Sequence, residues 1–149
     1  MGIEIPQNKF LILDGAMGTV LQQRGLSPQG RPELLNLTEP ELLDSVYKEY
    51  IAAVSQVIYA NTFGANGLKL AKTGHSVEEV VGAAIAVAKK AAAGTGTLVA
   101  LDVGPLGELL EPMGTLSFER AYDLFREMAE AGAKAGADLI VVETMTDLY

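Results

Sequence analysis

The feature that most constrains the fold is a set of four short apolar runs in which apolar and polar residues do not alternate. They lie at residues 10–13, 57–60, 97–103 and 139–142. Strands that are covered on both faces read as continuous aliphatic runs, whereas a strand with one solvated face alternates. The four runs therefore predict the strands of a buried parallel sheet.

Helical patterns separate these runs. Predicted N-caps stand at Thr38, Ser76 and Ser117, and the first two are followed three residues later by a glutamate, which is capping-box spacing. Strands that alternate with helices predict right-handed βαβ units. We therefore predict an α/β fold of parallel (β/α) units, with about four strands, as one partial domain over residues 1–149. No predicted helix follows the last strand, so we expect the chain to stop in mid-fold.

Composition narrows the class of protein. The chain is 49% hydrophobic with a net charge of −8 and has no basic stripe, so we expect no nucleic-acid partner. The longest apolar run is too short to span a bilayer and the N-terminus lacks a signal pattern, so we expect no membrane partner and a cytoplasmic location. There is no cysteine, and the single histidine, His75, is expected at the surface. We expect no metal or cofactor to be bound by this chain alone.

Polar residues stand where each predicted strand ends. The four ends carry Asp14-Gly15, Asn61, Asp102 and Glu143. Because the carboxyl ends of parallel strands meet at one rim, these residues are predicted to share a ligand site. Carboxylates can hold an ammonium group, and the glycine loop around Gly15 and Ala16 lets backbone N–H groups approach a carboxylate or phosphate. Such a rim suits a zwitterion such as an amino acid.

Each of these residues also has a structural interpretation. Asp14 has the residue type that caps the start of a helix or turn. Asn61 and Asp102 both precede turn-forming sequence and have the residue types that satisfy turn backbones. Glu143 has no such explanation, because it directly follows an apolar strand and acids are rarely buried without a partner. It is the candidate for which a functional role is most strongly favoured.

Five motifs in order make the sequence similar to a known family. They are "LDGAMGT", "PELLNLT", "VIYANTFGAN", "DVGPLGELLEPMGTLSFERAYDLF" and "GADLIVVETMTDL". Together they resemble the homocysteine S-methyltransferase family, and within it the homocysteine-binding barrel of cobalamin-dependent methionine synthases. The resemblance covers residues 10–149.

The resemblance implies a (β/α)8 barrel of the TIM type. In the family, zinc on three cysteine thiolates activates the homocysteine sulfur, which takes a methyl group from methylcobalamin or another donor. Carried onto this sequence, Asp14 and Glu143 would hold the substrate ammonium, and the backbone around Gly15 and Ala16 would hold its carboxylate. Asn61 and Asp102 would line the same rim.

The sequence also departs from the family. Four of eight strands are present, and the zinc-binding cysteines belong to the other half of the barrel. A turn that in the family often has a glycine and an acid, as in "AGAD" before the fourth strand, instead has Val54 and Gln56 before the second.

Three hypotheses follow. In the first, the chain is a fragment of a homocysteine S-methyltransferase that is inactive alone, binds homocysteine or methionine weakly, and pairs with a second copy or with the missing half of the barrel. In the second, it is a non-catalytic half-barrel that only folds and self-associates. In the third, it is one part of a split enzyme whose cysteines lie on another chain.

Overall fold

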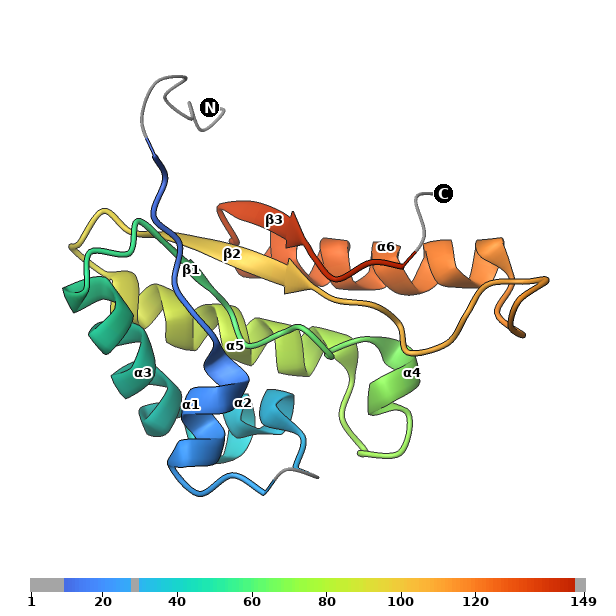
Figure 1. Cartoon of the computed structure of the whole chain (residues 1–149), viewed down its shortest axis with the longest axis horizontal. Helices are drawn as coiled ribbons and strands as arrows, with labels where there is room; N and C mark the ends of the chain where they lie inside the picture. The colour runs from blue at the N-terminus through green and yellow to red at the C-terminus, as the bar shows by residue number, and fades with distance from the viewer. Residues whose placement is uncertain (1–9, 28–29, 147–149) are drawn as a thin grey trace.

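A parallel sheet of three strands in the order β1-β2-β3 carries the fold. The structure is a computed structural model that describes residues 10–27 and 30–146. Its strands are β1 Val57–Tyr59, β2 Leu98–Val103 and β3 Leu139–Val142. Its helices are α1 Met17–Gln23, the 3₁₀ helix η1 Pro32–Leu34, α2 Leu35–Thr38, α3 Pro40–Ala52, α4 Gly67–Leu70, α5 Val77–Ala92 and α6 Phe118–Ala135 (Figure 1).

The first of the four predicted strands does not form, so the predicted strand count was wrong at this edge. Residues 10–13 run beside β1 but make only one isolated parallel bridge, between Leu13 and Val57. Phe10 is 97% exposed, so the start of this segment has no layer to pack against. The ladder therefore remains a single bridge beside a three-stranded sheet.

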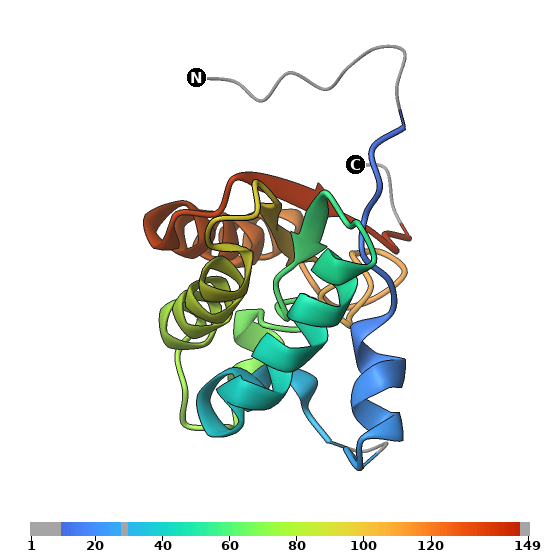
Figure 2. The same ribbon diagram turned by 90° about the vertical axis from the view of Figure 1, so that its left-hand side faces the viewer.

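The main core lies between the sheet and the helices α3, α5 and α6. Figures 1 and 2 show α5 and α6 side by side along one face of the sheet, with α3 next to α5. From β2 the residues Val99, Leu101 and Val103 point into this core, where they meet apolar residues of the helices such as Ile85 and Met128. Alternate residues of β2, among them Asp102, consequently face the opposite side of the sheet.

The helix caps follow the sequence in two places out of three. Ser76 accepts a hydrogen bond from the Glu79 N–H, and Ser117 accepts one from the Arg120 N–H, so both predicted N-caps are confirmed. The prediction for Thr38 was wrong, because this residue ends α2 and its hydroxyl donates to the Leu34 carbonyl. Because Thr38 belongs to the short helix α2, its side chain is not available to cap α3.

Among the described residues, no helix combines the length and the hydropathy that crossing a bilayer requires. Residues 1–9, which make up most of the segment that lacks a signal pattern, lie outside the described part of the chain. His75, the single histidine, is partly exposed and its Nδ1 lies 3.1 Å from the carboxylate of Glu79.

Candidate functional site

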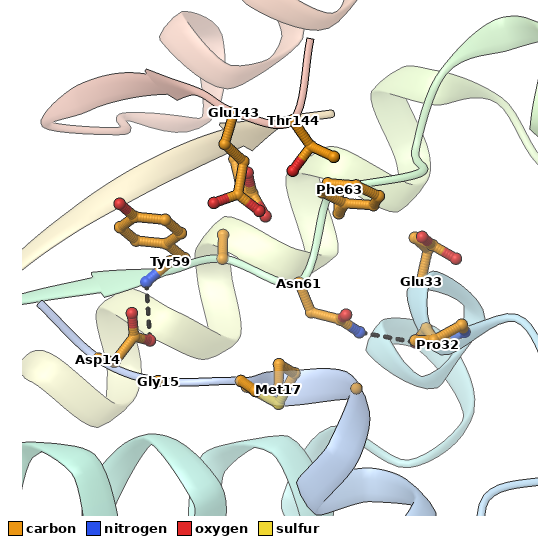
Figure 3. A pocket seen from close by; sticks show the side chains of 14 residues that line it. Asp14, Gly15, Met17, Pro32, Glu33, Tyr59, Asn61, Phe63, Glu143 and Thr144 are labelled. Carbon is orange, nitrogen blue, oxygen red and sulfur yellow. Dashed lines mark hydrogen bonds between the residues drawn. The ribbon is translucent and has the colours of Figure 1, made fainter. Parts of the chain in front are cut away.

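A cavity of about 570 Å³ opens at the carboxyl ends of the strands. Figure 3 shows that its lining comes from segments far apart in the sequence. The lining residues are Asp14, Gly15, Ala16, Met17, Gly18, Pro32, Glu33, Tyr59, Ala60, Asn61, Phe63, Asp102, Glu143 and Thr144. All six residues that the sequence singled out therefore line one cavity.

Asp14 joins the segment before α1 to the end of β1. Its backbone N–H donates to the Val57 carbonyl at 3.1 Å, and its carboxylate accepts from the Tyr59 N–H at 3.0 Å. The N-cap of α1 is Ala16, so Asp14 does not cap that helix. Burial raises the pKa of Asp14 to about 6, against the lowering effect of the Tyr59 hydrogen bond and with a further raising effect from Glu143.

Asp102 lies on the cavity side of β2. Its backbone N–H and carbonyl both bond the hydroxyl of Thr62, at 3.0 and 2.8 Å. Its side chain caps no turn, because the buried Oδ1 has no hydrogen-bond partner. Burial, followed by the nearby carboxylates of Glu143 and Asp14, raises the pKa of Asp102 to about 7.

Glu143 is the first residue after β3, and its backbone N–H continues the sheet by donating to the Val103 carbonyl at 3.1 Å. The register pairs Asp102 with Val141. Because side chains alternate along a strand, Glu143 faces the same side of the sheet as Val141 and therefore as Asp102. Figure 3 shows the Glu143 side chain directed into the cavity beside Thr144.

Asn61 has a structural role as well as a place in the lining. Its side-chain amide donates to the Pro32 carbonyl at 2.6 Å and to the Asn36 Oδ1 at 3.3 Å. Its backbone N–H donates to the Tyr47 hydroxyl at 2.9 Å, and its carbonyl accepts from the Asn36 amide at 2.8 Å. These bonds fix the η1 segment against the end of β1, so Asn61 positions one wall of the cavity.

The Gly15–Ala16 backbone is held against α3. A Cβ atom added to Gly15 would lie 3.0 Å from the Tyr50 hydroxyl oxygen, so the absence of a side chain permits the close approach. The same hydroxyl lies 3.4 Å from the Ala16 carbonyl, to which it donates. Figure 3 shows this backbone running along the cavity opposite Glu143.

Eight lining residues were not singled out from the sequence, and among them Tyr59, Phe63 and Glu33 have large or charged side chains. Tyr59 is the last residue of β1 and lies two residues before Asn61, so period-two alternation was a signal that could have placed it on the cavity face. Phe63 comes from the loop after β1 and Glu33 from η1, and the Glu33 carboxylate accepts the Gly64 N–H at 2.8 Å. Their position depends on contacts between segments about thirty residues apart, for which the local sequence has no signal.

The described residues do not fit the zinc site that the resemblance implies. They hold no group of three or more histidine, cysteine, aspartate or glutamate side chains placed to bind a metal ion. The whole sequence contains no cysteine, and zinc sites that activate a thiol use thiolate or imidazole ligands. What the cavity does offer is four carboxylates, from Asp14, Glu33, Asp102 and Glu143, and a backbone loop.

The fold and the site place the chain in the class of parallel α/β proteins in which acidic residues at the strand ends surround one cavity. Comparison with known proteins then shows that the chain belongs to the homocysteine S-methyltransferase family, whose model matches residues 11–149. It is 30% identical to a methionine synthase of Mycobacterium tuberculosis (strain ATCC 25618 / H37Rv) over 161 aligned positions. It is 29% identical to that of Mycobacterium leprae (strain TN) over the same length.

Solved structures agree with this assignment. The homocysteine methyltransferase MmuM from Escherichia coli matches with a TM-score of 0.80 and 28% identity in its metallated form, and with 0.81 and 28% in its oxidized form. These matches cover 94% and 95% of this chain and 56% and 55% of the MmuM chain. The alignments with the methionine synthases cover 98% of this chain and 13% of theirs. The chain thus spans about half the length of the solved relative and a small part of the curated ones.

Proposed function

We propose that this chain forms the amino-acid-binding part of a homocysteine S-methyltransferase, an enzyme that transfers a methyl group to the sulfur of homocysteine and yields methionine. The observation that carries the proposal is the convergence of Asp14, Asp102 and Glu143, each from a different strand end, on one cavity beside the Gly15–Ala16 backbone. Family membership supports homocysteine or methionine as the ligand.

In this proposal the Asp14 and Glu143 carboxylates hold the ammonium group of the ligand. They lie on opposite sides of the cavity in Figure 3, so an ammonium between them can donate to both. The carboxylate of the ligand lies against the backbone of Gly15 and Ala16, which line the cavity and whose N–H groups would donate to it. The sulfur then points away from the acids.

Sulfur activation requires groups that these residues do not supply. Zinc, when bound in the family, lowers the thiol pKa so that the sulfur is a nucleophile, and methylcobalamin is one methyl donor that the family resemblance implies. We propose that the ligands of that zinc come from outside these 149 residues. The chain by itself is then expected to bind the amino acid weakly and to transfer no methyl group.

A second observation concerns what covers β3. Ile140 and Val142 are 50% and 62% exposed, although the register places them beside Leu101 and Val103 of the main core. We propose that further (β/α) units of the family fold cover this face in the functional enzyme. Light scattering on a sizing column tests the alternative of self-association, because a defined dimer would show that a second copy covers the strand instead.

Isothermal titration with L-homocysteine and with two analogues tests the ligand. One analogue, γ-mercaptobutyrate, lacks the amine, and the other, homocysteamine, lacks the carboxylate. We expect homocysteine to bind and both analogues to bind at least about tenfold more weakly, because each loses a charge-assisted contact. Equal affinity for homocysteine and γ-mercaptobutyrate would contradict the assignment of the acids.

Variants of the chain complete the test. Asp14→Asn and Glu143→Gln are expected to weaken homocysteine binding about tenfold each, since each loses one charged partner of the ammonium. Glu108→Gln is the matched control, because Glu108 is an exposed acid outside this cavity. A loss of affinity in the control equal to that in the two variants would show that net charge, and not the site, is responsible.

A further inference from the structure

We propose that Asp102 couples ligand binding at this cavity to proton release, by changing from a neutral carboxylic acid to a carboxylate when the ligand ammonium binds beside it. This inference rests on the proposed function and adds a role for Asp102 in the same cavity. It begins from an unusual observation: the Asp102 side chain lies in the lining of the cavity, the residue is only 7% exposed, and its Oδ1 has no hydrogen-bond partner.

A buried acid in this position needs either a proton or a cation. A carboxylate that is removed from water without a donor is disfavoured, so the group holds its proton to a higher pH than in water, and a nearby positive charge favours the loss of that proton. The described lining residues include no lysine, arginine or histidine that could serve. Lys69 is the basic side chain associated with this rim, but its Nζ donates to the Pro105 carbonyl at 3.0 Å and lies over the Phe63 ring.

The groups near Asp102 that can carry a charge at neutral pH are carboxylates, and these disfavour its ionised form. Carboxylates face it from three elements, and tyrosine hydroxyls come from two more. They are Glu143 after β3, Asp14 before α1, Glu33 in η1, Tyr47 on α3 and Tyr59 on β1. Together with burial, the carboxylates raise the pKa of Asp102 to about 7. A ligand ammonium is the one charge in the proposed complex with the opposite effect.

The sheet geometry lets one ammonium reach two acids. Asp102 and Glu143 lie on the same face of neighbouring strands, displaced by two residues because Asp102 pairs with Val141. An ammonium held by Glu143 has three donors, so it can also donate to the Asp102 carboxylate where that side chain lines the cavity. Asp102 then loses its proton to the buffer, while the ligand keeps its own charge. No covalent bond of the ligand changes in this step.

Calorimetry in two buffers tests the inference. L-Homocysteine is titrated into the chain at pH 7 in phosphate and in Tris, because the difference in observed heat between buffers of unequal ionisation enthalpy gives the number of protons exchanged. With half of the Asp102 side chains protonated near pH 7, we expect the release of about half a proton per ligand, falling towards zero above about pH 8.

The variants separate this inference from the proposed function. Asp102→Asn keeps an acceptor oxygen but cannot titrate, so it is expected to bind homocysteine with a much smaller buffer-dependent heat, to which Asp14, with a pKa of about 6, contributes the remaining small fraction of a proton. Glu108→Gln, the exposed control acid, is expected to behave as the parent chain. Binding with no proton release by the parent chain, or with unchanged release by Asp102→Asn, would overturn the inference while the proposed function stands. Absence of any binding by the parent chain would overturn both.

A ligand-free measurement gives an independent check. Carbon-detected NMR of the side-chain carboxyl groups, assigned with Asp102→Asn, follows the titration of Asp102 directly. We expect its midpoint near neutral pH without ligand and a shift to lower pH in the presence of homocysteine. A midpoint near the ordinary value of aspartate in the ligand-free chain would overturn the inference even if homocysteine binds.

Discussion

Gln56 and Asp138 occupy the same position in two βα units of the chain. The Gln56 Oε1 accepts the Ile12 N–H at 3.1 Å, and the Asp138 Oδ2 accepts the Val99 N–H at 2.7 Å. In both units the residue therefore accepts a hydrogen bond from the neighbouring segment just before its own strand begins; for Gln56 that segment is residues 10–13, and for Asp138 it is β2. Gln56 thus supplies the hydrogen-bond acceptor that Asp138 supplies in the later unit. Although Gln56 departs from the family pattern, the contact with the neighbouring backbone is retained.

Val54, two positions before Gln56, fits its place in the turn less well than Gly136 fits the matching place before Asp138. Val54 has φ 66°, and its counterpart Gly136 has φ 87°. The turns have matching hydrogen bonds, because Ser55 N–H bonds to Tyr50 and Ala137 N–H bonds to Gly132 across the same number of residues. A left-handed conformation is readily adopted by glycine but is strained for a β-branched residue.

Replacing the strained valine should therefore stabilise the protein. Val54 is 67% exposed, so Val54→Gly removes little buried surface. We expect a gain of about 1 kcal/mol in the free energy of unfolding, since relief of the left-handed strain exceeds the backbone entropy that glycine adds to the unfolded chain. Urea denaturation measures it. The neighbouring Ala53→Gly, at an exposed position with φ −82°, is the control and should destabilise.

Tyr47 is predicted to matter for the cavity although it does not line it. Its side chain is fully buried and its hydroxyl accepts the Asn61 N–H at 2.9 Å. Tyr47→Phe leaves that buried N–H without a partner, so we expect a loss of about 1–3 kcal/mol in the free energy of unfolding. Thermal and urea denaturation check this. Tyr122→Phe, at a side chain that is 59% exposed, should change stability little. Equal effects of the two variants would argue against the Asn61 contact.

The acids of the cavity should make stability fall as pH rises. The pKa values of Asp14 and Asp102 are raised from 3.8 to about 6 and about 7, so between these limits the folded chain binds more protons than the unfolded one. Their contribution is fully present below about pH 4 and is lost as pH rises through 6 and 7. We expect Asp14→Asn/Asp102→Asn to flatten this dependence between pH 5 and pH 8, as measured by urea denaturation.

The comparison that decides this prediction is between variants at each pH. The double variant should be more stable than the parent at pH 8, and the difference should become small at about pH 4. Glu108→Gln, which removes an exposed acid outside the cavity, should follow the parent curve at both values. A double variant that runs parallel to the parent would show that neither acid titrates abnormally.

The sequence predicted the sheet best where burial is complete. The runs at 57–60, 97–103 and 139–142 became β1, β2 and β3, with ends shifted by no more than one residue. It also predicted that polar residues at the strand ends would meet, because parallel strands end at one rim. It did not predict α1, which follows the Gly15 loop directly, or the failure of residues 10–13 to extend their pairing. The formation of α1 and the pairing of residues 10–13 both depend on which segments pack beside β1. Local periodicity in the sequence carries no information about such packing.

Site roles were harder to predict than site membership. Asn61 and Asp102 have similar turn-like contexts in sequence, yet the amide of Asn61 is used to hold Pro32 while the Oδ1 of Asp102 has no partner. The difference arises from η1, which reaches Asn61 from about thirty residues away. A strand end thus fixes where a side chain points, and the neighbouring loops decide what it is free to bind.

At Gly132, α6 approaches the sheet so closely that there is no room for a side chain. A Cβ added to this buried residue would lie 2.7 Å from the Leu101 Cδ2 and 3.1 Å from its Cδ1, and Leu101 itself is fully buried on β2. Gly132→Ala should therefore destabilise by about 1–2 kcal/mol, because the strain of overpacking exceeds the gain in helix propensity. Gly82→Ala on α5, where an added Cβ meets nothing within 4 Å, should stabilise instead.

A double-mutant cycle assigns the effect to the contact. If the clash with Leu101 is the cause, Leu101→Val should make room, and Gly132→Ala should cost less in that background than in the parent chain. We expect a favourable coupling of about 0.5–1 kcal/mol from urea denaturation of the four proteins. Strict additivity would show that the helix and strand do not press on each other here. The distance between α6 and β2, which carries Asp102 on its opposite face, would then be set by other contacts.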